Sequence, residues 1–272
     1  MLKTESSPPL ALLLWHTPSL SPSTAARLLP VLSAAEQQRY GRIRAPRRQR
    51  EYLAGHFLVR EALTCLLPGW RASHRLELDG QQLRVHGPQA SAVDVNLSHS
   101  GDWVACLAGV NTRVGVDVEM PRRPRNCLEL ASEFFAEGEF QQLQALPAEQ
   151  RASAFYRLWT LKESHLKARR SGISAVELAR EFVPLDGEPG FKPPFKKPGL
   201  LQGVTDWFSY SFSVASAGRA QASGCAATLF GAITLSAPLS VPLAVQEYTL
   251  RDAGQSPRSP LTSIAPRAFR AR

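Results

Sequence analysis

The sequence lacks any apolar run long enough to cross a membrane. The longest candidate, Leu10 to Trp15, has six residues, whereas a membrane-spanning helix needs about 20. The run is also short for the apolar core of a secretory signal peptide, and an acidic residue, Glu5, precedes it. It predicts a buried first strand instead, and we expect a cytoplasmic protein with no membrane partner.

Cysteine patterns that bind zinc or cross-link small secreted domains are absent too. Four cysteines are spread over 272 residues, and none forms a C-x-x-C pair. Zinc ribbons and disulfide scaffolds need closer or more numerous cysteines, so these are expected to be reduced thiols. No G-x-S-x-G elbow surrounds Ser98, which argues against a serine hydrolase built on Ser98 and His99.

Positive charge exceeds negative charge and is concentrated in places. The formal net charge is +9, and residues 39–50 hold six arginines without an acidic residue. Such a patch suits phosphate groups or an acidic protein surface, although a solvated helix face has the same composition. A nucleic-acid-binding protein is an alternative, but the stretch has few aromatics beyond Tyr40 and Tyr52 for stacking on bases. We therefore expect no nucleic-acid partner.

Apolar periodicity predicts a mixture of helices and strands. Helical spacing is found over 47–67 and 149–169. Strands are expected at 10–15, 93–97, 103–110, 114–118, 207–214 and 225–235. Helices followed by strands occur twice, which predicts an α+β fold of two similar halves, 1–110 and 111–237. Residues 238–272 are expected to form a polar, partly disordered tail that can be removed with little effect on activity.

Two acidic side chains lie on one face of an expected strand. Arg113 to Glu119 alternates in polarity, so Asp117 and Glu119 leave the strand on the same side. Neighbouring carboxylates repel each other, and a bound cation relieves that repulsion. Oxygen ligands of this kind favour Mg²⁺, which commonly shares phosphate oxygens with a substrate. For a D-x-E pattern alone, an exposed acidic strand face is the alternative.

Two further segments carry polar groups. Glu163 and Lys167 lie one helical turn apart, next to Lys162. They are candidates for a third metal ligand and for phosphate contacts, although Glu four residues before Lys is also a favoured helical salt bridge. Ser98 and His99 lie where a strand meets a turn, and their donors suit a pyrophosphate. A turn capped by His99 is the alternative there.

Together these elements resemble the Sfp-type 4'-phosphopantetheinyl transferases. Asn96-Leu-Ser-His99 is similar to that family's N-[IVL]-S-H, and Gly115-Val-Asp-Val-Glu119 to its G-[IV]-D-[IV]-E. Trp159 to Lys167 is similar to its W-x-x-K-E-x-x-x-K. The three motifs occur in the family's order with agreeing separations, and the resemblance covers roughly residues 10–235.

The resemblance implies two pseudo-twofold-related α+β halves with coenzyme A in the cleft between them. It implies transfer of 4'-phosphopantetheine from coenzyme A to a serine of a carrier protein, with release of 3',5'-ADP. The partner would be an apo carrier protein or domain of fatty-acid, polyketide or nonribosomal-peptide synthesis. Two covalently linked halves favour a monomer.

The resemblance also implies roles for single residues. Asp117, Glu119 and Glu163 would hold Mg²⁺, and Glu163 and Lys167 would be the catalytic pair, with Glu163 as the candidate base. The expected coenzyme contacts are Arg48, Ser98, His99, Lys162 and Lys167, with Arg39 or Arg42 as alternatives to Arg48 on the 3'-phosphate.

Two positions depart from the family pattern. His86-Gly-Pro88 stands where many relatives carry Gly-Lys-Pro, and His56 follows a helix glycine where many carry arginine. Both changes concern coenzyme binding, and neither touches the metal set. Two other functions stay open, namely a degenerate family member that binds coenzyme A without transferring its arm and a basic nucleic-acid-binding protein.

Overall fold

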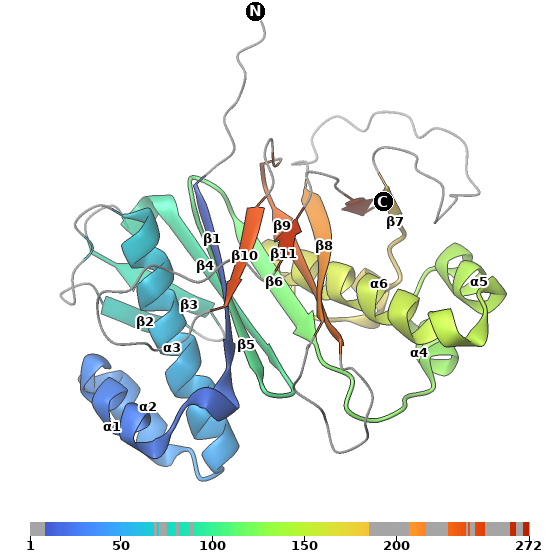
Figure 1. The fold of residues 1–272 in the computed structure, drawn as a ribbon. Coiled ribbons are helices and arrows are strands. Elements are labelled where there is room, and N and C mark those ends of the chain that lie inside the picture. The colour runs from blue at the N-terminus through green and yellow to red at the C-terminus, as the bar shows by residue number, and fades with distance from the viewer. Residues whose placement is uncertain are drawn as a thin grey trace, which may run out of the picture.

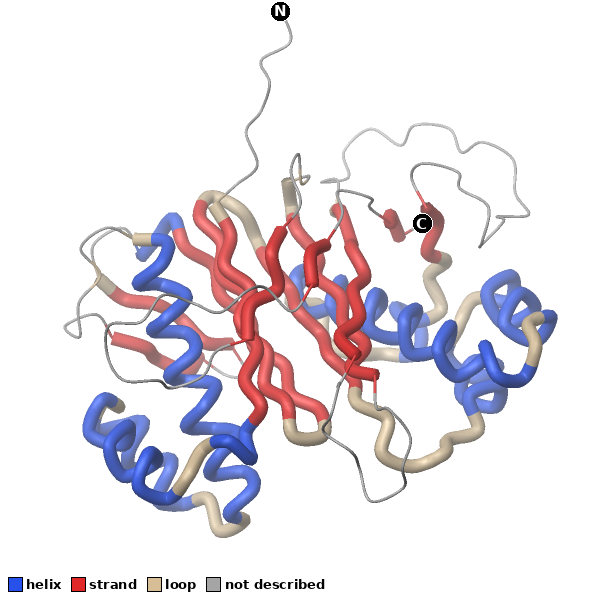
Figure 2. The backbone as a smooth tube through the Cα atoms, in the orientation of Figure 1, coloured by secondary structure: helices blue, strands red, loops and turns tan. Residues whose placement is uncertain are grey.

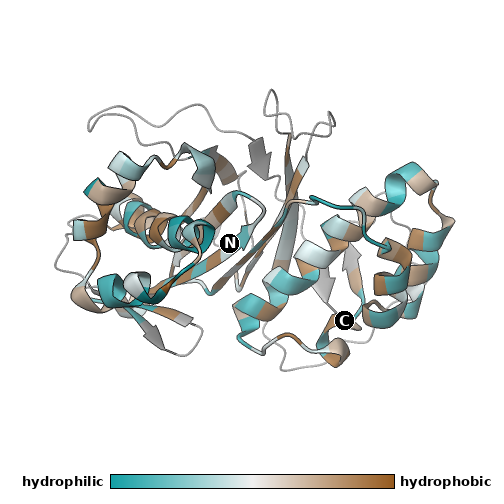
Figure 3. Ribbon diagram, turned by 90° about the horizontal axis from the view of Figure 1, so that it is seen from below, coloured by the Kyte–Doolittle hydropathy of each residue, from teal (hydrophilic) through white to brown (hydrophobic). Residues whose placement is uncertain are grey.

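The computed structural model describes residues 9–67, 70, 75–79, 82–87, 90–184, 207–215, 228–237, 239, 243–247, 262–264 and 269–271. Strands occupy the middle of the molecule, and helices cover its two outer sides (Figure 2). Seen from below, helices again stand on both sides, and apolar residues recur along the strands between them (Figure 3). The α+β class predicted from the periodicity is confirmed. In the described part of the chain, no helix is long and apolar enough to span a membrane.

The first sheet is built mainly by the N-terminal half. Its strands are β1 (Leu10–His16), β4 (Val93–Ser100), β5 (Trp103–Val110), β10 (Leu243–Glu247) and β11 (Thr262–Ile264), in the order β11-β10-β1-β5-β4. Helix α3 (Pro46–Leu66) covers its outer face and is flanked by α1 (Pro22–Leu28) and α2 (Ala34–Arg42) (Figure 1). A separate hairpin pairs β2 (Arg75–Asp79) with β3 (Gln82–His86). Single 3₁₀ turns lie at Thr17–Ser19, Leu29–Val31 and Ala90–Ala92.

The second sheet follows after residue 113. Its strands are β6 (Val114–Glu119), β7 (Phe182–Pro184), β8 (Phe208–Ala215), β9 (Thr228–Leu235) and β12 (Phe269–Ala271), in the order β6-β9-β8-β12-β7. Helix α6 (Ala148–Arg169) covers its outer face (Figure 1). The remaining helices on this side are α4 (Cys127–Phe134), α5 (Glu137–Ala145) and α7 (Ala175–Leu178).

The two sheets share one apolar core. Alternate residues of β1 and β5 meet Val114, Val116 and Val118 of β6 and the aromatic side chains of β8 in this core. The intervening β6 residues therefore face the other way, toward α6. Asp117 and Glu119 leave the strand on one side, as the alternation predicts. A pseudo-twofold relation between the halves stays a prediction.

The two predicted domain boundaries, near residues 111 and 238, lie close to described strands. The chain passes from the first sheet to the second between β5 and β6, close to the predicted boundary at residue 111. The interval 238–272, expected as a polar tail, contributes β10 and β11 to the first sheet and β12 to the second. The other residues of that interval, apart from 239, lie outside the described part of the chain, as does Cys225. Cys65, Cys106 and Cys127 carry free thiols.

Removing residues 238–272 is expected to destabilise the protein. β10 pairs in parallel with β1, Leu12 opposite Val245, and Val245 is 0% exposed in the core between the sheets. Its loss exposes apolar surface on β1, and burying one such side chain contributes about 1.5–3 kcal/mol. We expect the melting temperature of the truncated chain, followed by circular dichroism, to fall by about 10 °C. An unchanged melting temperature would support the prediction from the sequence that residues 238–272 can be removed with little effect.

A buried carboxylate joins α2 to α3. Glu36 is 4% exposed, and its oxygens lie 2.6 Å from His56 Nδ1 and 2.6 Å from Arg60 Nη2. Burial acts to raise the pKa of Glu36, but the hydrogen bonds from His56 and Arg60 outweigh it and lower the pKa to about 2. His56, one of the two departures from the family pattern, therefore has a structural partner within the first half.

Glu36→Gln is expected to lower stability at neutral pH and much less in acid. The pKa of Glu36 falls from its usual 4.5 to about 2 on folding, so its contribution is complete above pH 4.5 and is lost as the pH falls toward 2. We expect a loss of roughly 2–3 kcal/mol at pH 7, measured by urea unfolding. A difference between the two proteins that stays constant from pH 7 to pH 3 would contradict this linkage.

Candidate active site

Gly115 allows α6 to approach β6 closely. A Cβ at this position would lie 2.1 Å from the carbonyl oxygen of Ser164 and 2.5 Å from the amide nitrogen of Ala168. Only a residue without a side chain leaves room for that approach. Because Glu163 and Lys167 flank Ser164 on the same helix, the approach brings both against Asp117, two residues further along the strand.

Asp117 is the most enclosed of the acidic groups here. It is 2% exposed, and its Oδ1 accepts hydrogen bonds from Ser98 Oγ at 2.8 Å and Lys167 Nζ at 2.7 Å. Lys167 also donates to Ser98 Oγ at 3.0 Å. The second oxygen, Oδ2, is buried, and no residue in the described part of the chain donates a hydrogen bond to it. A buried carboxylate oxygen without a partner is costly, so this atom calls for a cation or a donor.

Two more carboxylates crowd Asp117. Ser100 Oγ donates to Glu119 Oε2 at 2.7 Å, yet burial, reinforced by the charge of Asp117, raises the pKa of Glu119. Burial and then the charge of Asp117 raise the pKa of Glu163 to about 7, with Lys167 acting the other way. We call Asp117, Glu119 and Glu163 the acidic cluster, and Lys167 lies against it. The mutual repulsion of the three carboxylates is the cost that a bound cation relieves.

The donor chemistry of the acidic cluster suits a hard divalent cation. Among the residues that the structure describes, no three His, Cys, Asp or Glu side chains are already arranged around a metal position. The carboxylates nevertheless offer oxygen atoms as metal ligands, and no described residue donates a hydrogen bond to Asp117 Oδ2. Magnesium and calcium take such oxygen ligands, and Mg²⁺ completes its shell with water and substrate phosphate.

A cavity of about 670 Å³ adjoins the acidic cluster. It lies among the start of α3, the β4–β5 turn and the segment after β6, and Glu119 contributes to its wall. The described residues that line it include five arginines and two carboxylates, so its field is positive and suits an anionic ligand. The arginines are Arg47, Arg48, Arg122, Arg123 and Arg125.

Glu51 holds two of these arginines in place. It is 5% exposed and accepts from Arg47 Nε and Arg48 Nη1, each at 2.8 Å. Arg47 also donates to the carbonyl of Gly101 at 2.6 Å, and Arg48 Nη1 lies 2.8 Å from His99 Nε2. Burial lowers the pKa of His99; Glu51 opposes this, and Arg48 adds to it. His99 is therefore a neutral imidazole that accepts from Arg48 at the cavity wall.

Comparison with known proteins identifies the family. The model of the 4'-phosphopantetheinyl transferase superfamily matches residues 113–197, a range that contains the whole acidic cluster. The 4'-phosphopantetheinyl transferase HetI of Nostoc sp. is 31% identical over 167 residues, which are 60% of this chain and 70% of HetI. The chain belongs to the 4'-phosphopantetheinyl transferase superfamily.

Two other members of the superfamily align over shorter shares. The 4'-phosphopantetheinyl transferase Sfp of Bacillus subtilis is 29% identical over 163 residues, 57% of this chain and 67% of Sfp. AcpT of Salmonella typhimurium, also named a 4'-phosphopantetheinyl transferase, is 34% identical over 122 residues, 45% of this chain and 59% of AcpT. These matches confirm the family and the enzyme class indicated by the three motifs.

Most of the site residues predicted from the superfamily motifs come together. Ser98, 6% exposed, lies inside the acidic cluster and bonds both Asp117 and Lys167. Arg48 and His99 lie at the wall of the adjoining cavity. Arg39 and Arg42, the alternatives to Arg48, are exposed on α2 and do not line it. The roles assigned to these residues stay predictions.

Lys162 has a different role from the one predicted. Its side chain is 0% exposed, and its Nζ lies 2.7 Å from Glu139 Oε2. It also donates to the carbonyls of Leu178 at 2.8 Å and Arg180 at 2.5 Å. An ammonium group has three donors, and these partners use all of them. No donor is left for the phosphate contact predicted for Lys162, which instead joins α5 and the α7 region to α6.

Sequence reasoning missed some residues of the positive cavity. Arg122, Arg123 and Arg125 follow the acidic strand directly, and three arginines within four residues were a visible signal for an anion site beside the carboxylates. Glu51 gave no such signal, because one glutamate in an arginine-rich helix has the pattern of an ordinary surface residue. Its neighbours Arg47 and Arg48 lie on the same helix, but its contact with His99 comes only from the packing of α3 against β4.

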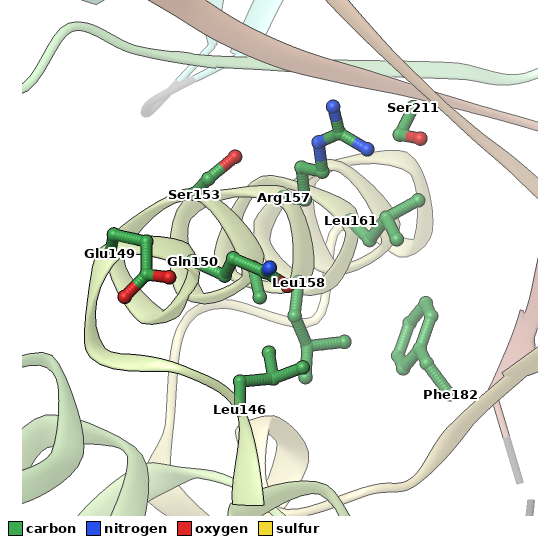
Figure 4. Close-up of a pocket in the computed structure, with 10 residues that line it drawn as sticks. Leu146, Glu149, Gln150, Ser153, Arg157, Leu158, Leu161, Phe182 and Ser211 are labelled. Atoms are coloured by element: carbon green, nitrogen blue, oxygen red, sulfur yellow. The ribbon is translucent and has the colours of Figure 1, made fainter. Parts of the chain in front are cut away.

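A second cavity, of about 610 Å³, differs in its chemistry. Figure 4 shows Leu146, Leu158 and Phe182 around it, with Arg157 of α6 at its edge. Among the described residues that line it, Arg157 is the one cation, and Glu149 offsets that charge. A ligand carrying several phosphate groups is therefore better matched by the arginine-lined cavity.

Proposed function

We propose that this protein is a Mg²⁺-dependent enzyme that transfers 4'-phosphopantetheine from coenzyme A to a serine of an acyl or peptidyl carrier protein, releasing 3',5'-ADP. One observation carries the proposal: the acidic cluster lies beside a cavity lined by five arginines. The names of HetI, Sfp and AcpT, which describe the same transferase activity in those proteins, support it.

The arginine-lined cavity is the proposed coenzyme site. Coenzyme A carries a 3'-phosphate and a pyrophosphate, and arginine forms paired hydrogen bonds with phosphate oxygens. Arg48 is oriented by Glu51 and His99, so part of its ordering cost is met before the ligand binds. Arg122, Arg123 and Arg125 supply positive charge from the other side of the cavity.

Asp117, Glu119 and Glu163 are the proposed holders of Mg²⁺. When bound, the ion neutralises charge on the pyrophosphate and on the oxygen that leaves with 3',5'-ADP. Lys167 lies against Asp117 and Ser98, where its ammonium can hold a phosphate oxygen beside the carboxylates. Transfer of this type depends mainly on positioning and charge neutralisation, which these residues supply.

Glu163 is the proposed base. As the serine oxygen bonds to phosphorus, the bond from phosphorus to the 3',5'-ADP oxygen breaks, and the hydroxyl proton moves to the base. Burial and the charge of Asp117 raise the pKa of Glu163 and so favour uptake of the proton, whereas a Mg²⁺ ion bound by the same carboxylate would oppose it. A monomeric state and a cytoplasmic location remain part of this proposal.

Incubation with coenzyme A, Mg²⁺ and an apo carrier protein tests the proposal. The carrier, weighed by intact mass spectrometry, should gain the mass of one phosphopantetheine arm, and no gain should occur with EDTA or without coenzyme A. Calorimetric binding of coenzyme A without any gain across fatty-acid, polyketide and peptidyl carriers would indicate the degenerate member instead. Salt-sensitive binding of DNA or RNA with no affinity for coenzyme A would indicate the nucleic-acid alternative.

A further inference from the structure

Strands β4 and β6 lie side by side, yet side chains join them in place of a backbone ladder. β4 has its backbone pairing with β5, and β6 with β9, so each is the edge strand of its sheet. Across the gap, four β4 side chains accept hydrogen bonds from the amides of three β6 residues and of Met120, the residue after β6, each donor 20 residues after its acceptor. The bonds are Val114 N to Asp94 Oδ2 at 2.9 Å, Val116 N to Asn96 Oδ1 at 2.9 Å, Val118 N to Ser98 Oγ at 3.3 Å and Met120 N to Ser100 Oγ at 3.1 Å.

We call these four bonds the side-chain bridges. Successive amides of a strand point to opposite edges, so the amides of Gly115 and Asp117 face β9 and those of Val114, Val116 and Val118 face β4. The three valines are at most 2% exposed, so the edge of β6 that has no backbone partner strand is buried. Buried amides need acceptors, and the alternate side chains of β4 supply them.

The bridges fix the register between the two sheets. Ser98 accepts from the amide of Val118 and donates to Asp117, and Ser100 accepts from the amide of Met120 and donates to Glu119. A shift of β6 by two residues would pair each serine with a different amide and separate it from its carboxylate. The position of the acidic cluster on the first sheet therefore follows from the bridges.

Asn96 occupies the bridge next to the acidic cluster. On one side of it Asp94 is held by Arg170, with 2.6 Å between Oδ1 and Nη2, and on the other side Ser98 bonds Asp117. Asn96 supplies an uncharged acceptor to Val116, the residue immediately before Asp117. Its contact is thus with the backbone that carries the carboxylate.

We propose that Asn96 is a positioning residue: its side-chain carbonyl holds β6 in register against β4 and so places Asp117 and Glu119 over Ser98 and Ser100. The consequence for catalysis rests on the proposed transferase function. The contact with Val116 does not, because it needs neither coenzyme A nor a metal.

Amide hydrogen exchange, followed by NMR on the full chain, tests the contact. In the wild-type protein the Val116 amide should exchange slowly although it faces away from β9, and fast exchange there overturns the proposal without any variant. In Asn96→Leu, which keeps the number and branching of the side-chain heavy atoms but removes the acceptor, the Val116 amide should exchange about tenfold faster. Gly115 and Asp117, whose amides face β9, should keep their rates.

Two further variants separate register from general stability. Asn96→Asp retains an acceptor oxygen and should restore slow exchange at Val116. Val95→Ala removes a buried side chain from the other face of β4, so it should lower the melting temperature without a selective effect on Val116. Unchanged exchange at Val116 in Asn96→Leu, or equal acceleration at Gly115, Val116 and Asp117, overturns the proposal.

Metal titration then tests the consequence for the acidic cluster. Mn²⁺ binding, followed by electron paramagnetic resonance, should weaken several-fold in Asn96→Leu and stay unchanged in Val95→Ala. Transfer to the carrier should need correspondingly more Mg²⁺ for its half-maximal rate. Unchanged Mn²⁺ affinity overturns the positioning role. If the wild-type protein transfers nothing while the exchange pattern holds, the proposed function fails and the register contact stands.

Discussion

Asp117→Asn is expected to reduce the rate of transfer by about 100- to 1,000-fold while the protein stays folded. The substitution keeps the shape of the side chain and removes the charge that Lys167 and Ser98 contact. It also replaces one of the carboxylate oxygens proposed to bind Mg²⁺. Since Asp117 helps to raise the pKa of Glu163, removing its charge relieves repulsion, and we expect no loss of stability.

The measurement is the rate of mass gain of an apo carrier at saturating coenzyme A, with circular dichroism as a check on folding. Glu137→Gln is the matched control, because Glu137 is an exposed carboxylate of the same half, at the start of α5. It should transfer at the wild-type rate. A wild-type rate in Asp117→Asn would refute the proposed metal role of Asp117.

Lys162→Met is expected to lower the free energy of unfolding by about 3–5 kcal/mol, because it leaves the buried carboxylate of Glu139 without its counter-charge. The carbonyls of Leu178 and Arg180 lose their donor as well. Glu139 also accepts from the amide of Phe182, so the change loosens the contact among α5, α6 and β7. Urea unfolding measures the effect.

Lys167→Met on the same helix is the matched comparison. Lys167 is 24% exposed, whereas the side chain of Lys162 is 0% exposed, so we expect Lys167→Met to lower the free energy of unfolding by less than Lys162→Met does, and transfer to be lost. The two substitutions should thus differ in effect: Lys162→Met should mainly lower stability, and Lys167→Met should mainly abolish transfer. A stable but inactive Lys162→Met would reverse this assignment and return Lys162 to the phosphate contacts predicted from the sequence.

Local sequence patterns were sufficient to predict the main elements and the chemistry that they carry. Apolar periodicity placed α3 and α6 to within one residue at each end, since a helix that covers a sheet must repeat its apolar side chains with the helical period. Strand alternation put Asp117 and Glu119 on one face, because the side-chain period of a strand is two. The three motifs, in order, indicated the superfamily before any contact was known.

The partner that each side chain meets depends on how distant segments pack. Lys162 and Lys167 lie five residues apart on one helix, and both faces of α6 are covered, so local pattern does not say which lysine meets a buried glutamate and which meets the acidic cluster. Asn96 finds its partner 20 residues away, across two sheet edges, and Val245 finds Leu12 at the other end of the chain. Apolar periodicity indicates which positions of a helix or strand are buried. It does not indicate which residue each of them contacts, because segments far apart in the sequence supply those contacts.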